Sequence, residues 1–155
     1  MAIDKVKAYF RQYGMEERVR EEATSSATVE EAAATLGCGP ERIAKTLSFH
    51  QGDRAVLVVT AGDQKIDNKK YRQQFGCKAQ MLKFEEVEPL VGHGVGGVCP
   101  FAVNEGVDVY LDVSMKRFET VFPAAGSSNS MIELTIEELE TYSRSKGWVD
   151  VCKER

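Results

Sequence analysis

The sequence has little of what metal centres, disulfide-stabilised folds and membrane spans require. Among its 155 residues are four cysteines, without a Cys-x-x-Cys pair, and only two histidines, so we expect no structural zinc site. No apolar run approaches the length of a bilayer span. The charged N-terminal segment also lacks the apolar core of a signal peptide. These features predict a cytoplasmic protein that uses no metal or other cofactor.

An excess of positive charge is also missing. Twenty Lys and Arg residues stand against 24 Asp and Glu residues, giving a formal net charge of −4 and a pI of about 5.3. This balance argues against a surface built wholly for duplex nucleic acid, but it allows a local basic patch. With 43% apolar and 28% charged residues, residues 1–155 fit a single domain that buries a core without disulfides.

Apolar spacing and capping residues predict the helices. Thr28 and Glu31 form a capping box at the start of one helix, and Gly37 ends that helix. Thr135 is expected to cap the last helix in the same way. We expect helices over residues 3–13, 29–36, 68–75, 84–91 and 136–145.

The strands are expected mainly as hairpins. Residues 46–49 alternate in polarity and residues 55–59 are continuously apolar, which predicts a hairpin whose second strand is covered on both faces. A second hairpin is expected where residues 101–103 and 107–112 flank the turn Asn104-Glu105-Gly106. Further strands are expected over residues 79–82, 120–124 and 131–134, with a short edge strand within 18–24. The fold class is therefore α/β of the α+β type, with an antiparallel or mixed sheet and helices packed outside it.

A glycine-rich stretch, Gly92–Phe101, is the most unusual part of the chain. Four of its first six residues are glycine, so its backbone can approach a ligand closely. The spacing Gly92-x-Gly94-x-x-Gly97 matches the dinucleotide fingerprint, but a helical segment precedes it and Pro100 follows, which excludes a Rossmann site. Two interpretations remain: a loop whose N–H groups hold a carbonyl oxygen or developing oxyanion, or a flexible connection.

Few side chains could add chemistry to this loop. Lys45 precedes an alternating strand, where it either extends into solvent or acts as a compact cation at a pocket edge. Cys99 could be a nucleophile, but no acid lies near it and His93 is in the same loop, so a small buried hydrophobe is favoured. The sequence shows no Ser-His-Asp set and no close pair of carboxylates. Catalysis would then rest on positioning, backbone donors and groups of the substrate.

Two polar clusters each have a functional and an ordinary interpretation. Lys65, Lys69, Lys70 and Arg72 either contact a phosphate backbone or form a solvated face. The loop 126–130 offers hydroxyl and amide groups, although turn formation alone explains its composition.

Several of these stretches together resemble the YbaK/ProX family of aminoacyl-tRNA deacylases, which is related to the editing domain of bacterial prolyl-tRNA synthetases. The resemblance covers residues 23–139 and is carried by Thr28–Ala33, Arg42–Leu47, Gly96–Phe101 and Ala125-Gly126 with Ile132-Glu133-Leu134. It implies a mixed, largely antiparallel curved sheet or barrel surrounded by helices. The implied activity is hydrolysis, without a metal, of the ester that joins a wrong amino acid to tRNA. Aminoacyl-tRNA is the implied partner, a prolyl-tRNA synthetase is a candidate second partner, and we expect a monomer or weak dimer.

The resemblance also implies roles for individual residues. Lys45 matches the essential lysine of the family, and Gly96, Gly97 and Pro100 fall in a Gly-x-x-x-Pro motif whose backbone handles the aminoacyl carbonyl. The residues expected beside the substrate are Ser26, Thr46, Val98, Cys99, Phe101, Gly126, Ser127, Ser128 and Asn129, and those expected on the tRNA backbone are Lys65, Lys69 and Lys70.

Two departures from the family pattern leave the amino-acid specificity open. In one, Ser127-Ser128-Asn129-Ser130 replaces the commoner basic-glycine turn. Cysteine-specific relatives carry an aspartate just before the Ile-x-Leu strand, where this sequence has Met131. Two other functions also stay open. The chain could bind a tRNA end or nucleotide without turnover, or it could be a regulatory or assembly domain in which the glycine loop is only a connector.

Overall fold

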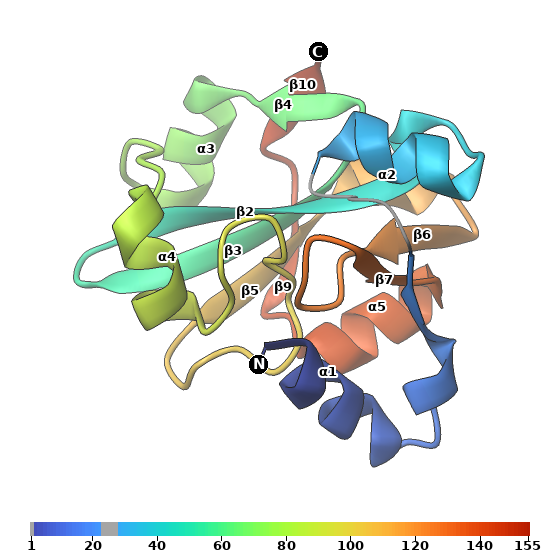
Figure 1. Ribbon diagram of the computed structural model, residues 1–155. Coiled ribbons are helices and arrows are strands. Elements are labelled where there is room, and N and C mark those ends of the chain that lie inside the picture. The colour runs from blue at the N-terminus through green and yellow to red at the C-terminus, as the bar shows by residue number, and fades with distance from the viewer. Residues whose placement is uncertain (1, 23–27) are drawn as a thin grey trace.

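The computed structural model describes residues 2–22 and 28–155 (Figure 1). The helices are α1 (Ala2–Arg11), α2 (Val29–Leu36), α3 (Asn68–Phe75), α4 (Phe84–Val91) and α5 (Ile136–Ser143), with 3-10 turns η1 (Glu16–Arg18), η2 (Pro40–Arg42) and η3 (Val113–Arg117). The strands are β1 (Val19–Glu21), β2 (Ile43–Gln51), β3 (Arg54–Ala61), β4 (Gln64–Ile66), β5 (Asp108–Asp112), β6 (Thr120–Pro123), β7 (Ser130–Ile132), β8 (Leu134–Thr135), β9 (Gly147–Val149) and β10 (Cys152–Glu154).

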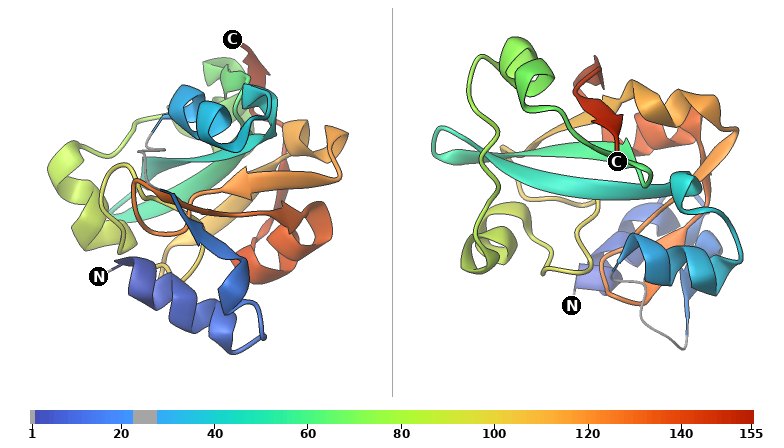
Figure 2. Two further views of the ribbon diagram at one scale, coloured as in Figure 1. Left: turned by 45° about the vertical axis from the view of Figure 1, so that its right-hand side comes forward. Right: turned by 90° about the horizontal axis from the view of Figure 1, so that it is seen from above.

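The main sheet has six strands in the order β8-β6-β2-β3-β5-β9. Its β2–β3 and β6–β8 pairs are antiparallel, whereas β2–β6, β3–β5 and β5–β9 are parallel. Two small antiparallel sheets, β1–β7 and β4–β10, complete the fold. Figure 2 shows α3 and α4 on opposite sides of the sheet, and α1 and α5 share the core cluster of α4. The expected mixed sheet with helices outside it is confirmed, and it curls into a half-barrel.

The central strand β3 is buried on both faces, as its continuous apolar run predicts. Leu57 and Val59 pack into a core shared with Phe10 of α1. The alternate residues Val56 and Val58 pack against Tyr71 of α3. Because successive side chains of a strand point to opposite faces, one apolar run supports both layers of helices.

The helices begin where the capping residues predict. Thr28 Oγ1 accepts a hydrogen bond from Glu31 N (3.1 Å) at the start of α2. At the start of α5, Thr135 Oγ1 accepts from Glu138 N (3.1 Å), and Glu138 Oε1 accepts from Thr135 N (2.9 Å). These side chains satisfy N–H groups that the first turn leaves without helical partners.

The expected second hairpin is wrong. Residues 101–103 form no strand, and β5 pairs in parallel with β3. The turn does form, since Val107 N donates to Asn104 O (3.3 Å), but Asn104 N donates to Val91 O (2.9 Å) at the end of α4. The preceding chain is therefore drawn toward α4 instead of pairing with β5.

The remaining differences involve short segments. The expected strand 79–82 is reduced to a single bridge between Met81 and Phe49. The expected strand 131–134 is divided into β7 and β8, which pair with different partners. Strands β9 and β10 were not anticipated from the sequence, because their three-residue lengths are too short for an alternating pattern.

Candidate active site

A cavity of about 470 Å³ opens along one edge of β2. Its walls come from β2, α2, α4, the glycine-rich loop and the β6–β7 connection, which lie around β2 in Figure 1. The apolar part of the wall includes Val29, Ala32, Ile43, Phe122 and Met131. Residues distant in sequence thus enclose one space suited to a small, largely apolar group.

The cavity exists because the edge of β2 is only partly paired. Strand β6 reaches only Ile43 and Ala44. Farther along, Ser48 O accepts from Leu82 N (3.1 Å) and His50 N donates to Gln80 O (2.7 Å).

Thr46 lies between the part of β2 that pairs with β6 and the part that bonds to residues 80–82. Backbone groups that face one edge recur every second residue in an antiparallel pair, so the N–H and C=O of Thr46 point into the cavity. Thr46 Oγ1 is also buried without a hydrogen-bond partner among the described residues. This position offers polar groups in an otherwise apolar wall.

Lys45 lines the same cavity from β2. It stands opposite Thr60 of β3, and its Nζ donates to the backbone oxygen of Gln64 on β4. Burial of the side chain lowers the pKa of Lys45 below its ordinary value, and the nearby positive charge of Arg155 lowers it further. Among the described lining residues, Lys45 is the only one with a side chain that titrates.

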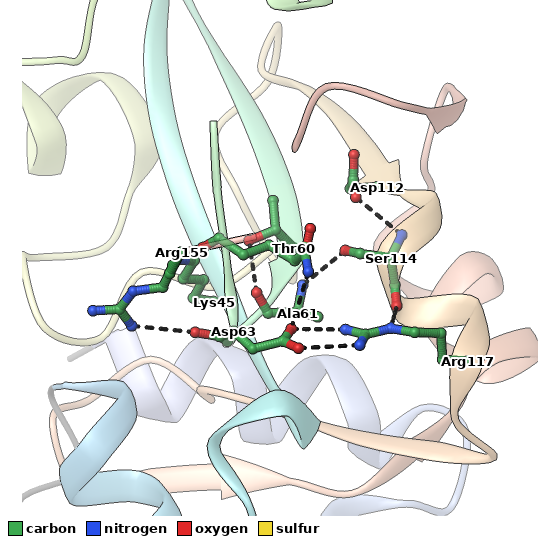
Figure 3. Close-up of polar contacts among 10 residues, drawn as sticks. Lys45, Thr60, Ala61, Asp63, Asp112, Ser114, Arg117 and Arg155 are labelled. Atoms are coloured by element: carbon green, nitrogen blue, oxygen red, sulfur yellow. Dashed lines mark hydrogen bonds and ion pairs between the residues drawn. The ribbon is translucent and has the colours of Figure 1, made fainter. Parts of the chain in front are cut away.

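Arg155 joins two segments beside Lys45, as Figure 3 shows. Its guanidinium donates to Gly62 O (3.3 Å) and lies 3.4 Å from a carboxylate oxygen of Glu30 on α2. Its backbone N donates to Asp63 O (3.2 Å). Arg155 therefore fixes the turn that precedes Gln64, the partner of Lys45.

The glycine-rich loop forms the wall near Lys45. Gly96 has a φ of +96° and lines the cavity together with Val98. Gly97 N donates to Gly94 O (3.1 Å), while the N–H groups of Gly96 and Val98 have no protein acceptor within residues 2–22 and 28–155. The structure therefore brings Lys45, Gly96 and Val98 to the same cavity.

Gly97 itself sits behind the wall, in contact with backbone. A Cβ at this position would lie 2.6 Å from Ser127 N and 2.7 Å from the carbonyl carbon of Gly126. Only glycine permits this approach, so Gly97 holds the loop against the 126–130 turn.

Cys99, Phe101 and Pro100 lie in the interior instead of on the cavity wall. Cys99 Sγ is 3.5 Å from His93 Nε2, but burial raises the pKa of Cys99 to about 12. The His93 ring hydrogen-bonds to Phe101 O (2.7 Å), and burial lowers the pKa of His93. This neutral pair cannot supply a thiolate near pH 7. Cys99 and Phe101 lie behind the cavity wall and support the loop, and their contact with a substrate stays a prediction.

The polar side chains of the 126–130 loop form hydrogen bonds mainly within the protein. Ser127 Oγ donates to Asn129 Oδ1 (2.9 Å) and Ser130 Oγ (2.7 Å), and Asn129 Nδ2 donates to Glu22 O (2.9 Å). Gly126 packs against the start of α1. In this loop only Ser130 reaches the cavity wall.

Two further residues were expected beside the substrate. Ser128 is exposed and outside the lining. Ser26 lies outside the described residues.

Sequence reasoning missed several wall residues because their own neighbours in the sequence give no functional signal. Phe122 comes from β6, Phe84 begins α4, and Met81 lies in the segment before that helix. Only the non-local closure of the sheet places them around Lys45.

The basic cluster divides into two kinds of lysine. Lys70 Nζ donates to Cys152 O (2.9 Å) and lies 3.2 Å from Asp150 Oδ1, so it ties α3 to β10. Lys65 and Lys69 are exposed, and their ammonium groups have no partner in the described part of the chain. Contact with tRNA stays a prediction for these two residues.

Neither a metal cluster nor a membrane span is found in the part of the chain that the structure describes. No group of three His, Cys, Asp or Glu side chains there is arranged to hold a metal ion. None of the described helices has the length and hydropathy of a membrane-spanning segment.

The half-barrel sheet, with a lysine and a glycine loop facing one cavity, defines the architecture of an aminoacyl-tRNA editing domain. The chain belongs to the aminoacyl-tRNA editing domain family, whose pattern matches residues 23–142. The structure is similar, with a TM-score of 0.87 and 26% identity over 98% of this chain and 97% of the other, to a protein solved as a candidate trans-editing enzyme for prolyl-tRNA synthetase.

The chain is similar to proteins of about its own length and to much longer ones. YwhH of Bacillus subtilis (strain 168), a protein of uncharacterised function, is 57% identical over 155 residues, which are 99% of each chain. The proline–tRNA ligase of the same strain is 31% identical over 103 residues, covering 66% of this chain and 18% of the ligase. The chain thus spans less than a fifth of that ligase but nearly the whole of YwhH.

Proposed function

We propose that this protein is a free-standing trans-editing deacylase, which hydrolyses the ester of a small amino acid mischarged on tRNA. The observation that supports the proposal is the cavity that Lys45 shares with Gly96 and Val98, whose N–H groups have no acceptor among the described residues. Family membership makes an aminoacyl ester the appropriate substrate class. Proline-type tRNA and a prolyl-tRNA synthetase are the proposed partners, by similarity to the ligase relatives.

Such an activity is needed because the selectivity of a synthetase pocket between similar amino acids is physically limited. A pocket that binds one amino acid cannot strongly reject a smaller one, because a missing methylene is worth only about 1–3 kcal/mol. A second site of smaller size is needed to remove the errors. The apolar wall that includes Ala32, Phe122 and Met131 favours a small, apolar amino-acid side chain over a charged one.

The chemistry follows from the few polar groups of the cavity. The Gly96 and Val98 N–H groups would stabilise the oxyanion that forms when the ester carbonyl is attacked. Lys45, as an ammonium ion, would orient an ester or ribose oxygen. The described lining contains no Asp, Glu, His or Cys that could activate a Ser or Thr hydroxyl, which favours water or a hydroxyl of the substrate as the attacking group.

The decisive test is deacylation of tRNAs mischarged with alanine, serine, threonine or cysteine. Lys45→Ala and Lys45→Met should each reduce kcat/KM by about 100-fold or more, a loss typical of an electrostatic catalytic group. Lys7→Ala is the matched control, because Lys7 pairs with Glu21 (3.0 Å) away from the cavity. If wild-type protein hydrolyses none of these substrates above the spontaneous rate, the deacylase proposal is wrong.

A non-catalytic module that binds the tRNA end is the second candidate, and it is favoured by the absence of Asp, Glu and His from the described lining. It predicts tRNA binding that weakens with salt and no acceleration of ester hydrolysis. The same panel separates the two functions.

A further inference from the structure

The mouth of the cavity carries the most exposed large apolar side chains in the described chain. Phe84, Met81 and Val95 are 77%, 57% and 55% exposed, and all three line the cavity. The two other exposed large apolar side chains of the described residues, Tyr13 and Val113, lie outside it. Apolar exposure is thus concentrated at one opening, where a binding partner is the ordinary explanation.

Phe84 is held in place by its own helix. It is the first residue of α4, and the preceding Lys83 N donates to Glu86 Oε1 (2.8 Å). Glu86 also contacts His50 Nε2 (3.0 Å) near the end of β2, and Val87 anchors the inner face of α4 in the core. An exposed aromatic ring on a fixed element can stack with little loss of conformational entropy.

The exposed ring is continuous with the candidate active site. Leu82 N donates to Ser48 O (3.1 Å), which joins the start of α4 to β2. Ser48 is three positions beyond Lys45, a separation of roughly 10 Å along a strand. Lys45 and Phe84 line the same cavity, so a nucleoside whose ester lies beside Lys45 occupies the space that the Phe84 ring borders.

We propose that Phe84, flanked by Met81 and Val95, stacks on a base at the single-stranded 3′ end of tRNA while the aminoacyl ester occupies the cavity. The inference rests on the proposed function, which supplies the substrate. A ring with apolar neighbours recognises the flat face of a base, and every base has one. Exposed side chains of both signs, Lys83 and Glu85, adjoin the ring, so stacking and not net charge is the interaction that this surface offers.

The test uses proline-type tRNA in which 2-aminopurine replaces the terminal adenine, because stacking quenches the fluorescence of this base. Wild-type protein should quench it on binding. Phe84→Leu should reduce the quenching and weaken binding by roughly 5- to 150-fold, the range for loss of one base–aromatic stack. Phe84→Trp should retain the quenching.

Tyr13→Leu is the matched control, since it makes the same change at an exposed aromatic residue outside the cavity. It should leave quenching and binding at the wild-type level. The slope of binding against salt should be the same for Phe84→Leu and wild type, because stacking releases no counterions. In steady-state deacylation the Phe84→Leu defect should appear in KM more than in kcat.

The outcomes separate this inference from the proposed function. Quenching by wild type that Phe84→Leu loses supports the stacking, even if no tRNA is deacylated. Equal quenching by wild type and Phe84→Leu overturns the stacking, even if deacylation is strong. A change of oligomeric state in Phe84→Leu with unchanged quenching would assign this surface to self-association and likewise overturn it.

Discussion

At the scale of single residues, Lys45 is the group whose protonation matters most. It lines the cavity, and burial followed by the charge of Arg155 lowers its pKa. Removing the positive charge with Arg155→Gln should therefore raise the pKa of Lys45. The ammonium form, and any activity that depends on it, should then persist to higher pH.

This shift can be measured directly by following the ¹³Cε resonance of Lys45 during a pH titration, assigned by its loss in Lys45→Arg. Arg20→Gln removes a guanidinium paired with Glu22 (2.9 Å) and serves as the control. An unchanged or lower Lys45 pKa in Arg155→Gln would show that Arg155 exerts no electrostatic effect on the site.

Gly97 is the residue that positions the glycine loop. In Gly97→Ala the new Cβ would meet the Gly126–Ser127 backbone at 2.6–2.7 Å, and backbone cannot move aside as a side chain can. We expect the free energy of unfolding to fall by about 1–3 kcal/mol, as for other overpacked sites, with reduced deacylation. Urea unfolding measures the first effect.

Gly94→Ala is the control within the same loop. Its Cβ would contact only the flexible Glu88 carboxylate, at 3.0 Å, so its free energy of unfolding should stay within about 0.5 kcal/mol of wild type. Equal destabilisation by the two substitutions would contradict the close contact assigned to Gly97.

At the scale of elements, α5 depends on an ion pair at its first turn. Arg18 lies 2.7 Å from Glu138, and its hydrogen bond, followed by the bond from Thr135 N, lowers the pKa of Glu138 to about 2. A carboxyl with a depressed folded pKa stabilises the fold above its unfolded pKa, and this stabilisation is lost as the pH falls toward 2.

Arg18→Ala should therefore lower the free energy of unfolding at pH 7, by about 0.5–1 kcal/mol because both side chains are partly solvated. The difference from wild type should shrink between about pH 4.5 and the acid limit of the folded state. Urea unfolding across this range tests it. As a control, Arg20→Ala should lower the free energy of unfolding by less at pH 7. A loss of stability in Arg18→Ala that does not change with pH would refute the ion-pair explanation.

The elements that sequence predicted well are those specified by local signals. Caps such as Thr28 and Thr135 begin helices within one turn of the chain, and the apolar run in β3 needs no knowledge of its neighbours. The failures depended on distant partners. Residues 101–103 were expected to pair with β5, yet the hydrogen bond from Asn104 to Val91 O could not be read from adjacent residues.

The same distinction applies to the candidate site. Lys45 and Gly96 were identified by their motifs, and the structure places both at one cavity. Thr46 was also named, but its edge-facing backbone follows from the register of β2 and the limited reach of β6. Phe84 gave no signal in sequence, because an apolar residue at a helix start is ordinarily buried.

At the scale of the whole molecule, the segment beyond the family match supports the site. The match ends at residue 142, while β10 pairs with β4 and brings Cys152 opposite Ile66. Strand β4 carries Gln64, whose backbone oxygen holds Lys45 Nζ. The position of Lys45 thus depends on segments well outside the motif in which it occurs.

This arrangement divides the lysines of the basic cluster by role, which a binding experiment can resolve. Lys65 and Lys69 are exposed, whereas Lys70 holds Cys152 O (2.9 Å). If the first two contact tRNA phosphates, Lys65→Ala and Lys69→Ala should each reduce the slope of log K against log salt by roughly 0.9. Lys70→Ala should instead lower the free energy of unfolding by about 1 kcal/mol, because it removes a hydrogen bond from a charged donor, and leave the slope nearly unchanged.

Fluorescence titration at several salt concentrations, with urea unfolding of the same variants, measures both quantities. A wild-type slope in both Lys65→Ala and Lys69→Ala would show that this face is solvated and that tRNA phosphates bind elsewhere.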